Sequence, residues 1–397
     1  MNTDVRARVA RSSKRARTAV FVGAITLAVA LSGCTTVNSG GDSGSGSDAA
    51  SQKGGSSSVT SLTGQSDAAI RKIVDGRTIT VGYVPPILSE YYTQVEKAAW
   101  NEMAEYTKRF GVKWEWSRQA PTGDAHSGSD TPGIVNGFIS RKFDVVLVCS
   151  AANAETMDPI YKSAAQQGTD IYQFNSTNEA GTPSTATDPT QGESSVTNIG
   201  YDNVYQSGYL AGKYIAEKLK GKGTIIQILG PSGSDWTKLR DIGFEKAIKE
   251  YPGLSIVGKA DGGYVRDKGF TAAQDLLTKN PKVNAIYGEN EEMALGGSQA
   301  IDAAGLKHWD GKDGIITIGA DGLVSGMEAI RQGKLTATVD VNSVDMGHAM
   351  IAAIFAHEVL GQHLDEFLRV PTGVVDKSNV DWHESYIKEQ LATSAKY

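Results

Sequence analysis

Residues 224–259 read TIIQILGPSGSDWTKLRDIGFEKAIKEYPGLSIVGK, and this stretch decides the fold. It begins and ends with short runs that contain β-branched side chains, at Thr224–Leu229 and Leu254–Lys259. Between these runs, apolar residues lie three and four positions apart, which is the spacing of an amphipathic helix. A strand, a helix and a second strand in this order are typical of a parallel sheet with helices packed on its faces.

The same alternation continues along the chain from Thr78 onward. Further strands are predicted at Thr78–Tyr83, Lys113–Ser117, Val145–Cys149, Asp170–Phe174, Ala285–Gly288, Ile315–Gly319 and Ala337–Val341. Helices are predicted at residues 91–110, 153–167, 203–220, 236–251, 268–279, 291–304, 322–332 and 343–361. These units are too many for one sheet of typical size. We therefore expect an α/β fold of two doubly wound parallel-sheet lobes.

The first 33 residues have the composition of a secretory signal. Six basic side chains precede residue 18, and the apolar run from Ala19 to Leu31 is too short to span a membrane. The sequence Leu-Ser-Gly-Cys that ends at Cys34 resembles the lipobox of bacterial lipoproteins. This resemblance implies cleavage before Cys34 and a lipid anchor on its thiol. The alternative is an ordinary secretory signal followed by an incidental cysteine.

A Ser/Gly-rich stretch follows Cys34. From Thr35 to Asp67, 17 of 33 residues are Ser or Gly, a composition that favours a flexible linker over a packed core. We expect residues 34–77 to form a tether.

Composition and charge exclude several classes of function. The chain has 45 acidic and 39 basic residues; without the first 33 residues, 44 and 33 remain, a net charge of −11. Such a charge argues against a nucleic-acid partner. The two cysteines, Cys34 and Cys149, cannot form a disulfide framework or a thiolate zinc site, and Cys149 is interpreted as a core thiol. His357 and His363 are six residues apart, whereas the zinc-protease motif needs four. We expect no metal, no cofactor and no enzymatic activity.

Aromatic and polar side chains follow the predicted strands. Because ligands of open parallel sheets bind beyond the carboxyl ends of the strands, these residues are candidates for a binding site. They are Tyr91, Tyr92, Asn175, Asp235, Trp236, Arg240, Tyr264, Asn290 and Asp321. Rings can cover the C–H faces of a sugar, while amide, carboxylate and guanidinium groups bind its hydroxyls. The pattern predicts a site for a polyhydroxylated ligand.

Structural interpretations of the same side chains stay open. Asn290 can cap the helix that it precedes, and Glu291 and Glu292 suit the positive end of that helix. Trp236 and one of the two tyrosines can be packing residues.

Two charged candidates also have a structural alternative. Arg240 can pair with Asp235 or Asp241 instead of binding a ligand. Asp321 precedes a glycine and can be a turn residue.

Five fragments of the sequence, in order, resemble the ribose-binding-like periplasmic solute-binding proteins. They are Tyr201-Asp202-Asn203 followed by Gly208 and Ala211-Gly212, Arg240–Phe244, Asn290–Gly296, Ile318–Gly322 and Gly333–Val339. The resemblance covers about 300 residues, from Thr78 to Val375. It implies two lobes joined by a three-segment hinge, with a sugar or related small molecule held between them and delivered to a membrane ABC permease.

The resemblance also implies roles for individual residues. Position by position, it marks Tyr91, Tyr92 and Tyr264 as aromatic walls, and Arg240, Asn290 and Asp321 as hydroxyl-binding residues. Asp202, in the first fragment, is also expected to bind a hydroxyl. The sequence departs from the family pattern at Ser89, Asn175-Ser176 and Val341, and Trp236 has no aromatic counterpart in the ribose binder. These departures imply a less charged, reshaped site. Residues 179–197 resemble an insertion near the hinge.

Together these observations predict a domain organisation and a function. We expect a signal at residues 1–33, a tether at 34–77, an N-terminal lobe of 78–201 plus 342–372, and a C-terminal lobe of 202–341 plus 373–397. The expected function is that of a monomeric, lipid-anchored, extracytoplasmic protein that captures a sugar or sugar alcohol for an ABC importer. The alternative is a sensor that presents such a ligand to a membrane kinase or chemoreceptor.

Overall fold

The computed structural model describes residues 64–122, 129–150, 152, 154–177, 195–201, 204–232, 234–392 and 396–397. The predicted signal, Cys34, the first part of the tether, Asp202 and residues 179–194 lie outside the described residues, as does the side chain of Asp235. Within the described ranges, none of the helices combines the length and the apolar character needed to cross a bilayer.

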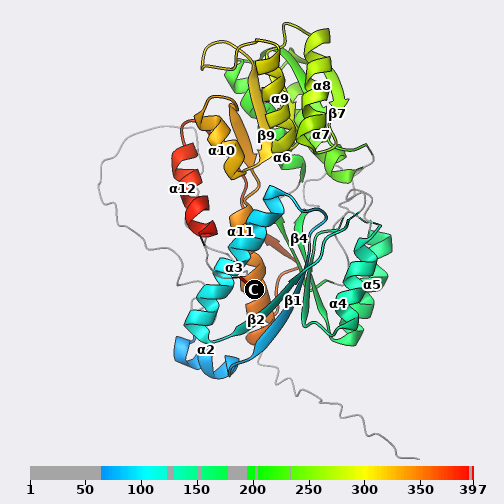
Figure 1. Cartoon of the computed structure of the whole chain (residues 1–397), viewed down its shortest axis with the longest axis vertical. Helices are drawn as coiled ribbons and strands as arrows, with labels where there is room; N and C mark the ends of the chain where they lie inside the picture. The colour runs from blue at the N-terminus through cyan, green and yellow to red at the C-terminus, as the bar shows by residue number, and fades with distance from the viewer. Residues whose placement is uncertain are drawn as a thin grey trace, which may run out of the picture.

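Two six-stranded sheets form the cores of two lobes, which lie one above the other in Figure 1. We call the lower one the N-lobe, with strand order β11-β5-β4-β3-β1-β2, and the upper one the C-lobe, with order β12-β10-β9-β8-β6-β7. The strands of each sheet run parallel, except β12, which is antiparallel to β10. This arrangement confirms the predicted α/β class with two doubly wound lobes.

The N-lobe sheet has helices on both faces. Its strands are β1 (Thr78–Val84), β2 (Lys113–Arg118), β3 (Val145–Val148), β4 (Asp170–Thr177), β5 (Thr197–Tyr201) and β11 (Phe367–Arg369). Its helices are α2 (Asp67–Val74), α3 (Glu90–Phe110), α4 (Thr131–Ser140), α5 (Ala154–Gln167) and α11 (Ser343–Ile354), which continues as the π-helical turn η1 (Phe355–Val359). Val81 packs with α2, α3 and α11, whereas Val84 packs with α4 and α5. The strands are therefore apolar on both sides, as buried parallel strands require.

The C-lobe repeats this plan. Its strands are β6 (Lys222–Leu229), β7 (Gly253–Asp261), β8 (Ala285–Gly288), β9 (Ile316–Asp321), β10 (Ala337–Asp340) and β12 (Gly373–Asp376). Its helices are α6 (Val204–Lys218), α7 (Asp235–Lys249), α8 (Arg266–Lys279), α9 (Glu291–Ala303) and α10 (Val324–Arg331). Ile225 packs towards α6 and α7, and the next residue, Ile226, packs towards α8 and α9.

Two glycines explain why α6 and α7 lie so close together. A Cβ atom on Gly208 would lie 2.0 Å from the carbonyl oxygen of Arg240, and one on Gly243 would lie 2.1 Å from that of Tyr205. Any larger residue at either position would push the helices apart. Since Arg240 lies on α7, this contact also fixes where its side chain starts.

The chain passes between the two lobes three times. The crossings lie between β5 and β6, between β10 and α11, and between β11 and β12. The last helix, α12 (Val380–Leu391), then lies against both lobes (Figure 1). It binds the C-lobe through Asp381 and Arg331, 3.1 Å apart, and the N-lobe through Gln390 and Asn101, 3.4 Å apart.

The end of the predicted tether is folded, which corrects that prediction. Residues 67–74 form α2, whose N-cap Ser66 accepts a hydrogen bond from the amide of Ala69. Ile70 and Val74, one helical turn apart, are buried against the N-lobe core. Two apolar side chains at this spacing give the helix a packing face despite the Ser/Gly-rich sequence before it.

Several other elements were not predicted, and one predicted helix differs in extent. The strands β5, β11 and β12 and the helices α4 and α12 were not predicted, and the predicted helix 343–361 is α-helical only to Ile354. The short strands β11 and β12 belong to different sheets although three residues separate them. Their pairing with β5 and β10 is a long-range contact that local periodicity does not encode.

Candidate functional site

The candidate residues gather where the two lobes meet, a region that we call the interlobe face. It comprises the residues at or just after the carboxyl ends of the strands in both sheets. In each sheet the first strand in sequence (β1 or β6) lies between the second and the third, so the strand order reverses there. Such reversal points are where open α/β sheets bind ligands. Tyr91 and Tyr92 follow β1, and Trp236 and Arg240 follow β6.

Both predicted tyrosines face the same amide in the N-lobe. The hydroxyl of Tyr91 lies 3.4 Å from Oδ1 of Asn175, and Nδ2 of Asn175 donates to the Tyr92 hydroxyl at 2.9 Å. The two rings are nearly perpendicular, with centroids 5.2 Å apart. Burial raises the pKa of both hydroxyls well above their usual value, so they stay protonated. Asn175 therefore orients the tyrosines, a role that the sequence did not suggest.

Cys149 lies beneath this group. Its thiol is buried, 3.5 Å from the Tyr92 hydroxyl, in agreement with its interpretation as a core residue.

On the C-lobe, Arg240 connects two loops. One Nη donates to the carbonyl oxygen of Glu289 at 2.5 Å, and the other lies 3.7 Å from Oδ1 of Asp321. Asp241 instead binds Gln227 and Lys259, so the alternative pairing of Arg240 with Asp241 is wrong. The guanidinium is thus held by the loops after β8 and β9.

Glu291 holds the loop that carries Asp321. Its buried carboxylate accepts hydrogen bonds from the amides of Gly322 at 3.2 Å and Leu323 at 3.0 Å. Glu291 lies in the first turn of α9, as predicted, and its side chain also binds the loop after β9. Burial raises the pKa of Asp321 to about 7, against the opposing effect of Arg240.

Asn290 and Tyr264 bind each other. Oδ1 of Asn290 accepts from the amide of Met293 at 3.0 Å, the N-cap interaction, while Nδ2 donates to the Tyr264 carbonyl at 3.3 Å. The hydroxyl of Tyr264 lies 3.1 Å from the hydroxyl of Thr237. The structure thus supports the capping interpretation of Asn290, with one amide hydrogen left for another acceptor.

Backbone strain concentrates at the same place. Seven non-glycine residues in the described part of the chain have positive φ, and four lie near the carboxyl ends of strands or just after them at the interlobe face: Asn175 (54°), Tyr264 (58°), Asp321 (153°) and Asn342 (56°). The other three lie at helix ends or turns. Non-glycine residues rarely adopt such values, and those that do cluster at functional sites.

Several buried polar atoms at the interlobe face lack a hydrogen-bond partner among the described residues. They are Nε of Arg240, Nε1 of Trp236 and Oε1 of Glu289. Buried polar groups are nearly always paired, because an unpaired one costs about 1–3 kcal/mol. These atoms are therefore places where a polar ligand can bind.

The two lobes touch at this face. Leu239 and Leu323 of the C-lobe belong to the hydrophobic cluster of the N-lobe, and Trp236 packs against it. Ser325 at the start of α10 donates to Glu90 at the start of α3 through both its amide (3.1 Å) and its hydroxyl (2.7 Å). Tyr91 of the N-lobe also lies close enough to Asp321 of the C-lobe for the charge of Asp321 to act on its hydroxyl.

The structure therefore brings eight of the predicted residues to one region. These are Tyr91, Tyr92, Asn175, Trp236, Arg240, Tyr264, Asn290 and Asp321. It adds Tyr201, Glu289, Glu291 and Asn342, which the sequence analysis did not select. Glu289 immediately precedes Asn290 after a strand, so its position alone was a usable signal.

The comparison with family models gives one match. Residues 81–362 match the periplasmic binding protein domain, which covers more than half of the chain. Among curated proteins, the ribose import binding protein of Bacillus subtilis is 31% identical over 221 residues, 52% of this chain and 69% of that protein. The ribose import binding protein of Salmonella typhimurium is 34% identical over 144 residues, 36% of this chain. The matched segment spans 46% of the Salmonella protein, about half of its length.

Solved structures agree on the fold. A periplasmic solute-binding protein of an ABC transporter from Actinobacillus succinogenes, with bound D-allose, has a TM-score of 0.65 at 23% identity and covers 76% of this chain and 99% of its own. One from Bacillus halodurans, with bound myo-inositol, has a TM-score of 0.63 at 23% identity, covering 77% and 97%. At these identities the likeness concerns the fold. With the family match and the curated relatives, it confirms the resemblance seen in the sequence: the chain belongs to the periplasmic binding protein family.

Proposed function

We propose that this protein binds a neutral sugar or sugar alcohol between its lobes and delivers it to an ABC importer from a lipid anchor at Cys34. The observation that carries the proposal is the pairing, across the interlobe face, of an aromatic group with a charged one. Tyr91 on the N-lobe, which lies against Tyr92, is close enough to Asp321 of the C-lobe to feel its charge, and Asp321 lies beside Arg240. Rings and forked hydrogen-bonding groups on opposite sides suit a ring-shaped ligand rich in hydroxyls.

The charges at the face favour a neutral ligand. The positive charge of Arg240 lies beside the carboxyl group of Asp321. Burial raises the pKa of Glu289 to about 8, so this group is mostly neutral at pH 7. At pH 7 Asp321, whose pKa is about 7, offsets part of the charge of Arg240, so little net charge remains to pair with an anionic or cationic substrate. Hydroxyl groups, which both donate and accept, match the mixture of donors and acceptors.

The names of similar proteins support the same ligand class. They include ribose import binding proteins, a xylitol-binding protein of Mycolicibacterium smegmatis at 25% identity, and structures with bound D-allose or myo-inositol. Each is named as a binding protein and not as an enzyme. Because Asn175-Ser176 and Trp236 distinguish this sequence from the ribose pattern, we expect a preferred ligand other than ribose.

A thermal-shift screen tests the ligand class. The purified chain is heated with ribose, allose, arabinose, xylitol, myo-inositol, a sugar phosphate or an amino acid, and the melting temperature is recorded. A ligand that binds only the native state raises this temperature. We expect a rise with at least one neutral polyol and none with the charged compounds. A rise with an amino acid or sugar phosphate alone would contradict the proposal.

Delivery to an importer needs a separate experiment. Deleting the gene should abolish cellular uptake of the radiolabelled polyol found in the screen. Normal uptake together with loss of a ligand-induced transcriptional response would instead support the sensor alternative. The anchor is tested by Cys34→Ala, which should release the protein from the membrane fraction into the medium.

A further inference from the structure

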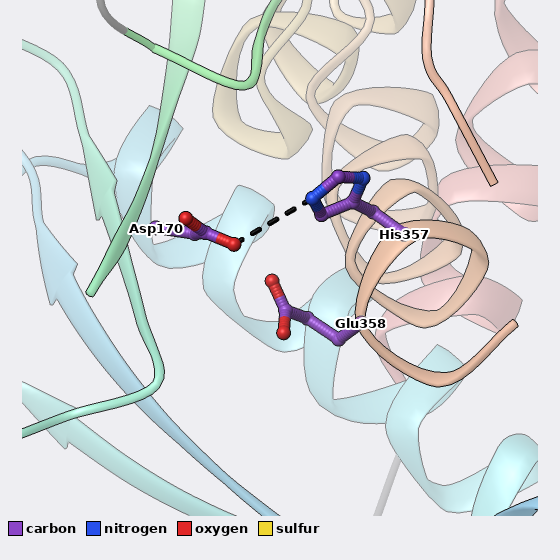
Figure 2. A group of neighbouring side chains, drawn as sticks. All are labelled: Asp170, His357 and Glu358. Atoms are coloured by element: carbon purple, nitrogen blue, oxygen red, sulfur yellow. Dashed lines mark ion pairs between the residues drawn. The ribbon is translucent and has the colours of Figure 1, made fainter. Parts of the chain in front are cut away.

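Three metal-binding types of side chain meet at the edge of the N-lobe sheet that lies away from the interlobe face. Figure 2 shows Asp170, at the start of β4, pointing towards His357 and Glu358 on the turn η1. One ligand-type atom of each residue lies within 4.8 Å of the others. All three side chains are partly accessible, with relative exposures of 36%, 30% and 11%. An ion from solvent can therefore reach them.

The spacing of the two nearest atoms suits a shared metal. Nε2 of His357 lies 3.5 Å from Oδ2 of Asp170, at the long limit for a hydrogen bond. Ligands of a tetrahedral zinc ion, with bonds of about 2.0–2.2 Å, lie about 3.4 Å from one another. This pair already has the separation of two zinc ligands. A ligand-type oxygen of Glu358 lies within 4.8 Å of both atoms, so a rotation of this partly exposed side chain would complete the set.

The imidazole is oriented as metal-binding histidines are. Nδ1 of His357 lies 2.9 Å from the carbonyl oxygen of Gln362, which can only accept a hydrogen bond. Nδ1 therefore carries a proton, and Nε2 faces the carboxylate of Asp170. A histidine that binds a metal usually donates its other ring N–H to such a carbonyl. His357 lies in a π-helical turn, in which the amide of Leu360 donates to the carbonyl oxygen of Phe355, five residues earlier, at 3.2 Å. This backbone bond supports the orientation of the imidazole.

The carboxylate of Glu358 also has outer partners. The hydroxyl of Tyr172 donates to Oε1 at 3.3 Å, and Arg77 approaches Oε2 at 3.5 Å. A bound dication would replace the proton between Nε2 of His357 and the carboxylate of Asp170, and would lie within reach of Glu358.

We propose that Asp170, His357 and Glu358 bind a divalent transition-metal ion, and Zn²⁺ in particular, with water in the fourth position. Imidazole nitrogen with carboxylate oxygen selects Zn²⁺ over Mg²⁺ and Ca²⁺, which prefer oxygen ligands alone. The ion joins the start of β4 to the end of α11. Helix α11 starts at the hinge and has 12 residues, so at 1.5 Å a residue it is about 18 Å long. The proposed metal site, beyond its far end, is therefore separate from the interlobe face.

Calorimetric titration of the chelator-treated full chain with ZnCl₂ tests the proposal. We expect one saturable site, no comparable heat with MgCl₂ or CaCl₂, and a higher melting temperature with zinc. Asp170→Asn and His357→Gln should each weaken zinc binding at least ten-fold. The matched control is His308→Gln, since His308 pairs with Asp302 at 2.9 Å elsewhere on the surface. This control should leave zinc affinity unchanged.

Two results would overturn the proposal. One is the absence of a saturable zinc site in the wild-type chain, which would leave the group as an ion-pair network with a protonated His357. The other is zinc affinity that persists in both Asp170→Asn and His357→Gln, because the ion would then bind elsewhere. Unchanged polyol binding by the two variants would show that they are folded and that the N-lobe is intact.

Discussion

Glu289 and Asp321 both contact the guanidinium of Arg240, although only Asp321 does so with its carboxyl group. Arg240 contacts Asp321 through its side chain and Glu289 through the backbone carbonyl. Oε2 of Glu289 accepts a hydrogen bond from the amide of Gly230 at 2.7 Å, which holds the loop after β6. Both carboxyl groups have a raised pKa because burial disfavours the charged form. Burial of these two carboxyl groups at the interlobe face therefore costs free energy, as is common in binding sites.

The first prediction concerns Glu289 and pH. Its pKa rises from the usual 4.5 to about 8 on folding, so between these values the unfolded chain loses this proton while the folded chain keeps it. This contribution to the free energy of unfolding is full below pH 4.5 and is lost as pH rises through 8. Glu289→Gln has no proton to lose, so its advantage over wild type should grow by about 3–4 kcal/mol between pH 5 and pH 8. Urea unfolding at pH 5 and pH 8 measures this difference.

The control for this experiment is Glu105→Gln, because Glu105 is exposed on α3. Its effect should be the same at both pH values. An effect of Glu289→Gln that does not change between pH 5 and pH 8 would mean that Glu289 is ionised in the folded protein.

The second prediction concerns Asp321 as a ligand-binding residue. Asp321→Asn keeps the shape of the side chain but removes the carboxylate beside Arg240. A ligand hydroxyl loses a charged acceptor, so we expect affinity for the polyol to fall ten-fold or more. Calorimetric titration measures this, and Asp275→Asn on the exposed side of α8 is the control. Equal affinities for the two variants would remove Asp321 from the site.

At the scale of elements, the short helix α2 forms part of the N-lobe core. Ile70 and Val74 pack against the lobe, while Ile73, on the same helix, is 45% exposed. Arg109 on α3 also binds Asp67 on α2 through two nitrogens, at 2.8 and 2.9 Å. The folded domain therefore begins before β1.

The third prediction tests this packing. Ile70→Ala should lower the free energy of unfolding by about 2–4 kcal/mol, because it leaves a cavity beside α3. Ile73→Ala on the exposed side of the same helix should change it by less than about 0.5 kcal/mol. Chemical denaturation measures both variants. Similar small effects would mean that α2 does not contribute to the core in solution.

The helices and strands differ in how clearly the local sequence predicts them. Strands such as β6 and β8 were predictable, because a run of β-branched residues between helices is a local signal. Helix α2 was missed because its two apolar positions follow a long Ser/Gly-rich stretch. The role of Glu291 was missed because its partners, Gly322 and Leu323, are distant in the sequence. Contacts between loops depend on the tertiary fold, which local patterns do not record.

At the scale of the whole molecule, two lobes meet at one face, and α12 and three crossing segments join them. The contact of Glu90 with Ser325 connects the first turns of α3 and α10 directly across the lobes. A domain rotation about the crossing segments would break this contact. We infer that it favours the arrangement in which the lobes touch, so that ligand binding and lobe closure reinforce each other.

The fourth prediction follows from this contact. Glu90→Ala removes the acceptor of two hydrogen bonds between the lobes, so the ligand-free protein should spend more time open. Small-angle X-ray scattering should show a larger radius of gyration, which added polyol reverses. The apparent affinity for the polyol should fall in proportion to the decrease in the fraction of closed molecules. Glu105→Ala on the same helix is the control, and an identical radius of gyration in all three proteins would contradict the role of Glu90.

The most direct measurement is a crystal structure with the polyol that gives the largest thermal shift. We expect electron density for the ligand at the interlobe face, in contact with Tyr91 or Tyr92 on one side and with Arg240 and Asp321 on the other. We also expect the ligand to be chemically unchanged. A ligand that contacts only one lobe, or that lies on another surface, would contradict ligand binding between the two lobes.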